Sequence, residues 1–421
     1  MPTGRVHVIG AGLAGLAAAI RLAQPGRAVV LHDSAGHAGG RCRSFFDDHL
    51  GCRIDNGNHL MLSGNWAIRD YLEIVGAGDS LTGSEDAAFL FRDLRSGETW
   101  TVRPDKGAIP WSILSGRGRV PGTTLGEYLR ALRLARAGAD QTIQDCLGGP
   151  GMLYERFWEP LAIGVLNTPM ETASARLLWP VIRETFGRGR EACRPLMARE
   201  GLSESFVAPA LSYLEKHGGE VRFNDRLRKL TFGNGRLEGL EFAGGTIDLA
   251  AEDRVVSALP AWAAADLIPG LEGPRGTHAI VNAHFRLTTA PVGAPPVIGL
   301  VGGTAQWVFV RGDMASVTVS AADDLAGEPN EAIAERLWPE VRAALGLTDE
   351  PMPAWRIVKE KRATIAQTPA EDRRRPRAET KWSNLVLAGD WTATGLPATI
   401  EGSIRSGFHA ADLIVTSLSS Y

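Results

Sequence analysis

Residues 5–22, RVHVIGAGLAGLAAAIRL, decide the fold. A short β-rich run leads into a turn with the spacing GxGxxG, and a helix-forming run rich in alanine and leucine follows. Glycines at this spacing permit a tight turn, let the backbone approach a pyrophosphate and let the helix pack close to the strand. The helix N-terminus adds free N–H groups and the positive end of a dipole. The stretch predicts a strand, a phosphate-binding turn and a helix, with these cofactor-binding residues: Gly10, Gly12, Leu13, Ala14 and Gly15.

An arginine before an apolar run is also typical of a secretory signal, so the next segment decides between the two interpretations. Residues 28–32, AVVLH, predict a second strand that ends at Asp33, 23 residues after Gly10. A carboxylate at this distance from the glycine turn can accept hydrogen bonds from ribose hydroxyls. We therefore interpret the start of the chain as a dinucleotide-binding unit.

Length, charge and cysteine content restrict the class of protein. A chain of 421 residues exceeds the size of one typical core, so two domains are expected. With 45 Lys and Arg against 48 Asp and Glu, the chain has no general basic field for nucleic acid. The four cysteines form no CxxC pair and no metal-ligand spacing, which favours a reducing, cytoplasmic location and predicts no metal site. No apolar run reaches the roughly 18 residues of a spanning helix.

A second glycine pair follows the first unit. Gly39, Gly40 and Arg41 would bring a bare backbone and a guanidinium to the same diphosphate, although a plain turn with a solvated charge is the alternative. With the first turn, this pair favours FAD over NAD, and residues 10–59 resemble the start of the amine oxidase and phytoene desaturase class of flavoproteins. That resemblance adds further cofactor-binding residues: Asn56, Gly57 and Leu227.

The end of the chain resembles the closing flavin-binding element of the same class. Residues 384–388 predict a buried strand, and residues 395–402 are expected to open a helix after Pro397 that runs to about Val415. A helix N-terminus there would stabilise the negative charge of a reduced flavin near N1 and C2=O, and the same helix can also face a core. By this resemblance Asp390 bonds the ribityl or pyrophosphate part, and the element contributes these cofactor-binding residues: Gly389, Asp390, Pro397, Ala398 and Thr399.

Between these ends the pattern changes twice. Residues 67–200 are mostly helical in pattern, residues 202–260 return to the nucleotide-domain style with a hairpin signal at Asn234-Gly235, and later residues are rich in strands. We predict an α/β fold: a discontinuous Rossmann-like FAD-binding domain of the amine oxidase and phytoene desaturase type, with an inserted α+β substrate domain. The FAD-binding domain is expected over residues 1–66, 201–260 and 382–421, and the substrate domain, with a helical subdomain, over 67–200 and 261–381.

Residues 159–169, EPLAIGVLNTP, narrow the resemblance. Together with 306–309 (QWVF), 360–364 (EKRAT) and 395–402 (GLPATIEG), they resemble the hydroxysqualene dehydroxylases of bacterial hopanoid pathways. The resemblance covers most of the chain. Two departures are visible: Asp33 stands where the class more often has glutamate, and Asn58 where these enzymes often have glutamine. The family resemblance implies a reductive removal of an allylic hydroxyl, in which hydroxysqualene and reduced FAD give squalene, water and oxidised FAD.

That reaction sets requirements for the site. Hydroxide is a poor leaving group, so an acid or hydrogen-bond donor must assist it, and a developing allylic cation favours a dry pocket with aromatic faces. The candidates for the acid are His59, Asp55 and Glu401, although a histidine here can equally be a structural hydrogen bonder. The expected substrate pocket is lined by side chains that could also be plain core: Trp158, Leu166, Asn167, Trp307, Phe309 and Trp391.

Two alternative functions and one surface property complete the expectations. A carotenoid or phytoene-type desaturase would use the same pocket in the oxidative direction, and a GDP-dissociation-inhibitor-like prenyl-binding protein would lack flavin chemistry. The expected partner is a long apolar isoprenoid. Residues 111–136 mix apolar side chains with arginines, which indicates either peripheral contact with the inner face of a membrane or an ordinary amphipathic face. The arginines at 373–375 and 377 indicate lipid headgroup contact or, more simply, a solvated surface.

Overall fold

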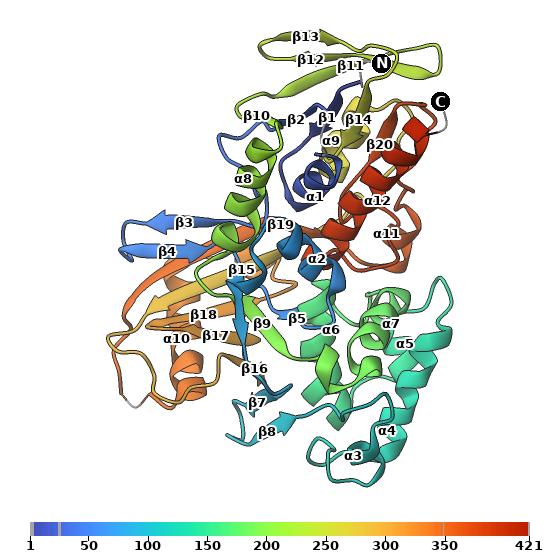
Figure 1. The fold of residues 1–421 in the computed structure, drawn as a ribbon. Helices are drawn as coiled ribbons and strands as arrows, with labels where there is room; N and C mark the ends of the chain where they lie inside the picture. The colour runs from blue at the N-terminus through green and yellow to red at the C-terminus, as the bar shows by residue number, and fades with distance from the viewer. Residues whose placement is uncertain (1–3, 24–26, 348, 420–421) are drawn as a thin grey trace.

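A five-stranded parallel sheet carries the glycine-rich turn in the computed structural model, which describes residues 4–23, 27–347 and 349–419 (Figure 1). The strands at its centre are buried along their whole length because both faces of the sheet are covered, which is why they read as continuous apolar runs. In sheet order the strands are β10 (Glu220–Arg222), β2 (Val29–His32), β1 (Val6–Ile9), β14 (Arg254–Ser257) and β20 (Leu385–Leu387).

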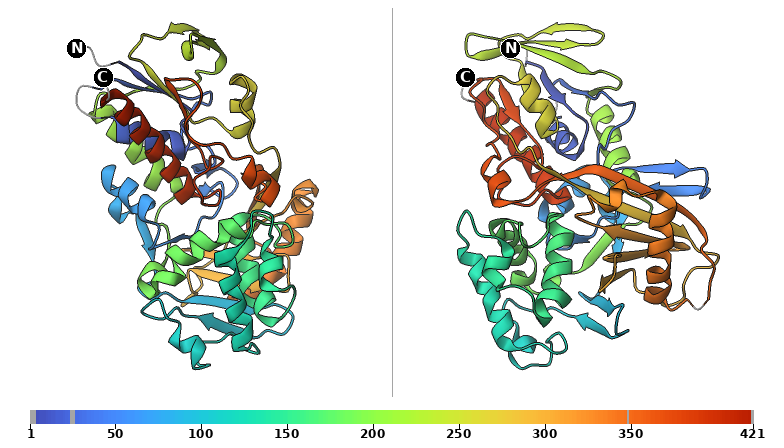
Figure 2. Two further views of the ribbon diagram at one scale, coloured as in Figure 1. Left: turned by 90° about the vertical axis from the view of Figure 1, so that its right-hand side faces the viewer. Right: turned by 180° about the vertical axis from the view of Figure 1, so that it is seen from behind.

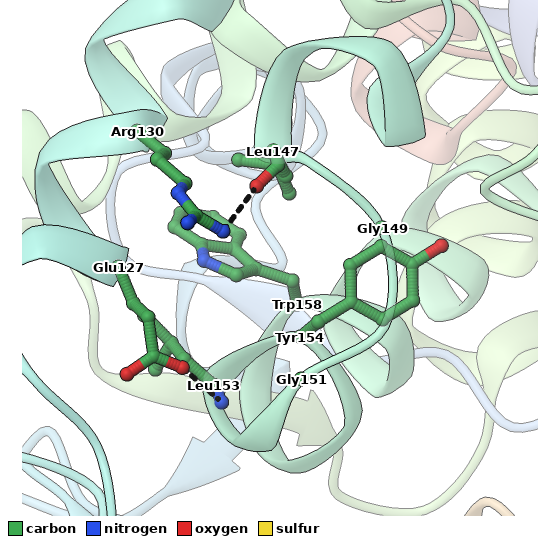
Figure 3. A pocket seen from close by; sticks show the side chains of 8 residues that line it. All are labelled: Glu127, Arg130, Leu147, Gly149, Gly151, Leu153, Tyr154 and Trp158. Carbon is green, nitrogen blue, oxygen red and sulfur yellow. Dashed lines mark hydrogen bonds between the residues drawn. The ribbon is translucent and has the colours of Figure 1, made fainter.

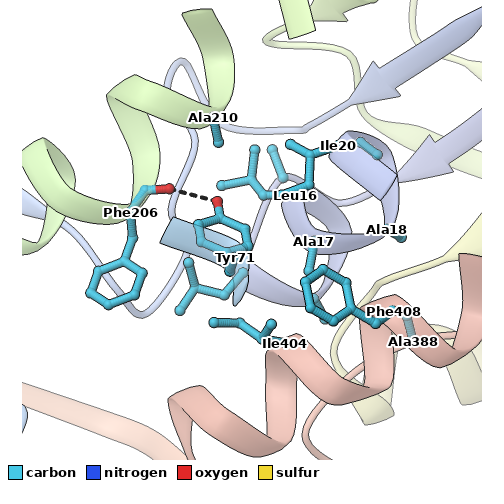
Figure 4. Close-up of a cluster of buried hydrophobic side chains, with 14 of the residues drawn as sticks. Leu16, Ala17, Ala18, Ile20, Tyr71, Phe206, Ala210, Ala388, Ile404 and Phe408 are labelled. Carbon is cyan, nitrogen blue, oxygen red and sulfur yellow. Dashed lines mark hydrogen bonds between the residues drawn. The ribbon is translucent and has the colours of Figure 1, made fainter. Parts of the chain in front are cut away.

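Helices cover one face of this sheet and bury the largest core of the molecule (Figure 4). Leu16 and Ile20 of the first helix meet Tyr71 and Phe408 there, and the Tyr71 hydroxyl donates to the backbone oxygen of Phe206 at 2.6 Å. Small residues line the contact between the first and last helices, so their backbones come close together. The helices are α1 (Leu13–Leu22), α2 (Trp66–Ile74), α8 (Ala208–Lys216) and α12 (Ile400–Ser419).

An antiparallel meander and a short helix cover the other face. Asn234 and Gly235 both have positive φ, 49° and 74°, which is the backbone of a tight hairpin turn, so the hairpin prediction is confirmed. Ile9 and Val255 of the parallel strands pack against Leu240 of the meander. The elements are β11 (Leu227–Gly233), β12 (Arg236–Phe242), β13 (Gly245–Asp248) and α9 (Ala261–Leu267).

A seven-stranded sheet forms the second half of the molecule, visible from two further sides in Figure 2. All its pairs are antiparallel except β16 with β7. The helix α10 (Asn330–Leu345) packs on it through the core that contains Ile333, Leu337 and Phe285. In sheet order the strands are β19 (Ala354–Ile365), β15 (Thr277–Arg286), β18 (Met314–Val319), β17 (Trp307–Arg311), β16 (Val297–Val301), β7 (Phe89–Asp93) and β8 (Thr99–Val102).

A helical region packs beside this sheet, and short strands join it to the rest. The helices are α3 (Trp111–Leu114), α4 (Leu125–Leu129), the 3₁₀ helix Arg130–Arg136, α5 (Ile143–Leu147), the π-helix Tyr154–Trp158, α6 (Glu159–Leu166) and α7 (Ala175–Glu184). The joining elements are β3 (Ser44–Asp47), β4 (Cys52–Asp55), β5 (Met61–Leu62), β6 (Leu81–Gly83), β9 (Pro195–Ala198) and α11 (Pro369–Arg373). In the part of the chain that the structure describes, no helix is long and apolar enough to cross a bilayer.

Candidate functional site

The glycine turn between β1 and α1 leaves room for a ligand. A Cβ at Gly15 would lie 1.8 Å from the backbone oxygen of Gly10, whose own φ is +110°, so both positions require glycine for the turn itself. A Cβ at Gly12 would meet nothing within 4 Å, and no side chain caps α1 there. The first N–H groups of α1 have no partner inside the helix and face this open space. The geometry fits a phosphate group.

Asp33 holds the turn from the end of β2. One carboxylate oxygen accepts from the N–H of Ala11 at 2.7 Å, and the other accepts from the N–H of Ala35 at 2.8 Å. Each oxygen keeps a further lone pair, so the carboxylate can still accept from a ribose hydroxyl. The shorter side chain of Asp33 is therefore placed by the backbone of the turn. The contact with a ribose stays a prediction.

Arg41 joins the two ends of the chain. Gly12 and Gly39 form an isolated parallel bridge, which brings the second glycine pair beside the first turn. One Nη of Arg41 donates to Asp390, 349 positions later, at 2.8 Å. The Asp390 carboxylate raises the pKa of Arg41, which keeps the guanidinium charged. The Arg41 side chain is 43% exposed and Asp390 only 6%, so part of the guanidinium remains free for an anion.

The loop after β4 is fixed by its asparagines. Asn56 donates to the backbone oxygen of Arg41 at 2.9 Å and accepts from the N–H of Arg43, so it sets the path of the arginine loop. Asn58 donates to the hydroxyl of Thr318 on β18 at 3.0 Å, which ties this loop to the seven-stranded sheet. Gly57 lies between them. These contacts position the loop. The cofactor contacts predicted for the loop stay predictions, and so does the cofactor contact predicted for Leu227, which is half-buried at the start of β11.

Arg375 shapes the C-terminal loop. The prediction that Arg375 lies on a solvated surface is therefore wrong. Its side chain is almost fully buried, and its guanidinium donates to the backbone oxygens of Asp390 (2.9 Å), Thr392 (3.0 Å) and Leu396 (2.7 Å). The surface interpretation does hold for Arg373, which is exposed and pairs with an acid. A buried guanidinium with several backbone acceptors fixes the loop that carries Asp390.

Gln367 connects the same loop to the helical region. Its amide oxygen accepts from the N–H of Ala398 at 2.8 Å, and its amide nitrogen donates to the backbone oxygen of Leu166. Asn167, at φ 48°, ends α6 and donates to the hydroxyl of Thr364 at 3.0 Å. Leu166 and Asn167, both predicted for the substrate pocket, therefore lie in a buried joint, at 0% and 2% exposure. The N–H of Ala398 is occupied by Gln367 and is not free for a cofactor.

The start of α12 presents its N-terminus next to this joint. The Thr399 hydroxyl accepts from the N–H of Gly402 at 3.1 Å and caps the first turn. Pro397 precedes it and has no N–H of its own. A helix N-terminus in this place fits the role expected from the sequence, since it favours negative charge on a bound ligand.

Glu401 makes contacts that favour a structural role. Its carboxylate accepts from the N–H groups of Ala67 (3.1 Å) and Ile68 (3.0 Å) at the start of α2, and from Arg405. Burial raises the pKa of Glu401, and its side chain is 6% exposed. Both oxygens face the N-terminus of α2, so we interpret Glu401 as the cap that fixes α2 on α12.

His59 and Asp55 line one pocket with Phe309 and Arg311. Asp55 accepts from the hydroxyl of Ser44 at 2.6 Å and from Arg311 at 3.1 Å, so both of its carboxylate oxygens already have a partner. Burial lowers the pKa of His59, which keeps the imidazole neutral. A neutral imidazole can donate one N–H, so His59 suits a hydrogen-bond donor in this pocket. The pocket has these further lining residues: Asn58, Met197, Ala198, Leu202 and Ser316.

The predicted aromatic walls are divided among three places. Phe309 lines the His59 pocket, and Trp307, on the same strand, donates to the backbone oxygen of Pro160 at 3.3 Å. Trp158 lines a separate pocket in the helical region (Figure 3). Trp391 is 2% exposed, belongs to the core under the parallel sheet and donates to the Leu259 backbone. The interpretation of Trp391 as a pocket wall is therefore wrong, because its ring packs inside the nucleotide unit.

Several residues of the site had no recognisable sequence signal. Arg311 and Ser44 hold Asp55, and Gln367 and Arg375 hold the C-terminal loop. Their partners lie between 11 and 256 positions away in the chain, outside the spacing of a single turn or helix face, so a local pattern does not reveal them. In the described ranges, no group of three or more His, Cys, Asp or Glu side chains is arranged to hold a metal ion.

Comparisons with known proteins agree with this geometry. Residues 13–415 match the model of the flavin containing amine oxidoreductases. The chain is 46% identical to the hydroxysqualene dehydroxylase of Rhodopseudomonas palustris over 97% of this chain and 98% of that protein, and 44% identical to the one of Sinorhizobium fredii over 98% of each. Among solved structures, the cyclohexylamine oxidase of Brevibacterium oxydans has the same fold, with a TM-score of 0.69 and 14% identity over 99% of this chain and 100% of that one. The α/β fold predicted from the sequence is confirmed.

Proposed function

Because the chain belongs to the flavin-containing amine oxidoreductases, and within them to the hydroxysqualene dehydroxylases, we propose that it reduces hydroxysqualene to squalene with FAD. The observation that carries this proposal is the similarity to the hydroxysqualene dehydroxylases over the whole length of both proteins. Such a similarity includes the substrate half of the molecule as well as the nucleotide half. The flavin itself follows from the family, and FAD in particular fits the dinucleotide-type turn.

The residues present fit FAD. The open space in front of Gly12 and the partly exposed guanidinium of Arg41 suit its diphosphate, and Asp33 suits the ribose. Asp390 would hold the ribityl part, and the N-terminus of α12 would face the pyrimidine edge. When bound in its reduced form, FAD supplies the hydride that replaces the hydroxyl.

The residues of the His59 pocket would handle the leaving group. We assign His59 as the hydrogen-bond donor to the departing hydroxyl oxygen, because Asp55 is held in an ion pair and Glu401 caps α2. Phe309 offers an aromatic surface for the positive charge that develops at the allylic carbon. Apolar neighbours of the pocket would exclude water, which strengthens the hydrogen bond from His59.

The function is tested by product analysis. Reduced enzyme, incubated anaerobically with detergent-dispersed hydroxysqualene, is expected to give one squalene per flavin while the flavin becomes oxidised. Oxidised enzyme in the same mixture is the control and is expected to give none. A dehydrogenated polyene, or a flavin that stays reduced beside unchanged substrate, would contradict the proposed reaction.

Replacing His59 tests the donor. We expect His59→Phe to lower kcat by about 10²-fold or more, the range for loss of one positioned hydrogen-bond donor to developing negative charge, with FAD still bound. His59→Gln keeps an N–H donor and should recover part of the rate. His409→Phe, at an exposed histidine on α12, is the matched control. If the flavin of His59→Phe is oxidised in a single turnover as fast as that of the wild type, His59 is not the donor.

Replacing Asp390 tests the flavin contact at the other end of the chain. Asp390→Ala should weaken FAD binding by about 1–3 kcal/mol, the range for loss of a buried hydrogen bond to the ribityl part, and Arg41 also loses one of its acceptors. The FAD dissociation constant, measured by fluorescence quenching on reconstituted apoprotein, gives the number. Asp412→Ala removes a surface partner of Arg21 and serves as the control. An unchanged dissociation constant for Asp390→Ala would mean that this carboxylate only holds Arg41.

We further propose that the enzyme works in the cytoplasm at the inner face of the membrane. Its apolar isoprenoid substrate is nearly insoluble in water, since burial of each methylene from water is worth about 0.8 kcal/mol. The substrate is therefore held in lipid, and the enzyme must meet it at the lipid surface.

A further inference from the structure

Exposed large apolar side chains are concentrated in the helical region. Of the ten large hydrophobic residues that are exposed in the described part of the chain, six lie between residues 109 and 152. Trp111 is 65% exposed and Leu132 is 61% exposed. The helices α3 and α4 lie at the end of the molecule away from the parallel sheet (Figure 1). The six, here called the apolar face, are Ile109, Trp111, Leu114, Leu129, Leu132 and Met152.

This face is not the inner side of an amphipathic helix. Leu134, in the same 3₁₀ helix as Leu132, is 1% exposed and packs into the core, so that core is already satisfied. The hydroxyl of Tyr128 accepts from the N–H of Val120 at 2.8 Å, which fixes α4 against the segment after α3. The outward apolar side chains are therefore held by a packed scaffold, and an exposed cluster of this kind marks an interaction surface.

Positive charge predominates around the apolar face. Residues 107–152 contain five arginines and three carboxylates, of which Glu127 caps α4, Asp145 caps α5 and Asp140 pairs with Arg373. Arg117, Arg133 and Arg136 are exposed, and no carboxylate lies within ion-pair distance of them in the described residues. Free guanidinium groups beside exposed tryptophan and leucine complement a surface that is apolar within and anionic at its boundary, as a bilayer of anionic lipids is.

A pocket opens through the same helices (Figure 3). Glu127 and Arg130 line it and flank Leu129, while Gly151 and Leu153 line it and flank Met152. Its inner wall is Trp158, which belongs to the same buried apolar cluster as Phe309 of the His59 pocket. Continuous apolar packing thus leads from the apolar face to the candidate active site.

We propose that the apolar face docks on a bilayer that contains anionic lipid, with Arg117, Arg133 and Arg136 at the headgroups and the Trp158 pocket turned to the lipid. The part that concerns the substrate rests on the proposed function, because only an apolar substrate would use this route. Docking itself rests on the side chains of the face. It therefore requires no flavin.

Vesicle flotation tests the docking. The holoenzyme should float with vesicles of phosphatidylcholine and phosphatidylglycerol, and at least tenfold less should float with phosphatidylcholine alone. Trp111→Glu with Leu132→Glu should lower flotation on the anionic vesicles at least tenfold. Trp262→Glu replaces a tryptophan that is 51% exposed on α9, outside the face, and should float as the wild type does. Flavin content and circular dichroism of each variant establish that it is folded.

Turnover separates this proposal from the proposed function. The double variant should keep its rate on detergent-dispersed hydroxysqualene and lose at least tenfold on substrate embedded in vesicles. If the wild type floats but forms no squalene in either medium, the proposed function is contradicted and the proposed docking is not. Wild-type protein that stays in the soluble fraction with both kinds of vesicle, or a double variant that floats as well as Trp262→Glu, would overturn the docking surface.

Discussion

Gly12→Asp is expected to give a folded protein that no longer retains FAD. The position has open space around it, so the side chain fits the protein itself, and its φ of −71° suits any residue. The new carboxylate would occupy the space in front of α1, where it would repel and displace the diphosphate. We expect affinity to fall by at least about 100-fold, which corresponds to about 2.7 kcal/mol. The flavin-to-protein ratio from absorbance after gel filtration measures it.

A matched substitution controls for the general cost of the carboxylate. Gly78→Asp places the same side chain at an exposed glycine with nothing within 4 Å, far in sequence from the turn, and should leave the flavin content unchanged. Gly12→Ala adds only a methyl group and should fall between the two. If Gly12→Asp purifies with a full complement of flavin, the glycine turn does not hold the diphosphate.

The fold was predictable where the signal is local. The glycine spacing at residues 10–15 and the Asn234-Gly235 turn each require a particular backbone, and only a few residue types allow it, so short segments identify it. The pairing of β16 with β7, which is parallel in an otherwise antiparallel sheet, was not predictable. It joins residues that are about two hundred positions apart, and neither segment carries a local signal that identifies its partner.

The glycine spacing and the family resemblance selected Arg41 and Asp390, which the structure brings together, while their contact with FAD stays a prediction. The site was not predictable where a side chain acts through distant backbone. Glu401 caps a helix 333 positions earlier, and a carboxylate after a flavin-binding loop looks the same in sequence whether it caps a helix or donates a proton. Trp391 was misassigned because an aromatic residue next to Asp390 gives no indication of which side of the loop it packs on.

Arg375→Met should produce the second large effect, because it removes the group that organises the C-terminal loop. Methionine is apolar and comparable in length, but it leaves the backbone oxygens of Asp390, Thr392 and Leu396 buried without their donor. Leaving a buried acceptor without its donor costs about 1–3 kcal/mol, and three acceptors lose theirs here. We expect a lower midpoint in urea unfolding and a weaker hold on FAD, since the loop positions Asp390 against Arg41.

A substitution at the neighbouring arginine separates the role of Arg375 in holding the loop from the effect of its charge alone. Arg374→Met removes the same charge one residue earlier, at an exposed position, and should leave both the urea midpoint and the flavin content unchanged. Arg375→Lys keeps the charge but has a compact ammonium in place of a planar guanidinium, so it can reach only part of the acceptors and should recover only part of the stability. If Arg375→Met unfolds at the same urea concentration as Arg374→Met, the buried guanidinium does not hold the loop, and the ion pair between Arg41 and Asp390 must be positioned by the strand β20 and the helix α12 alone.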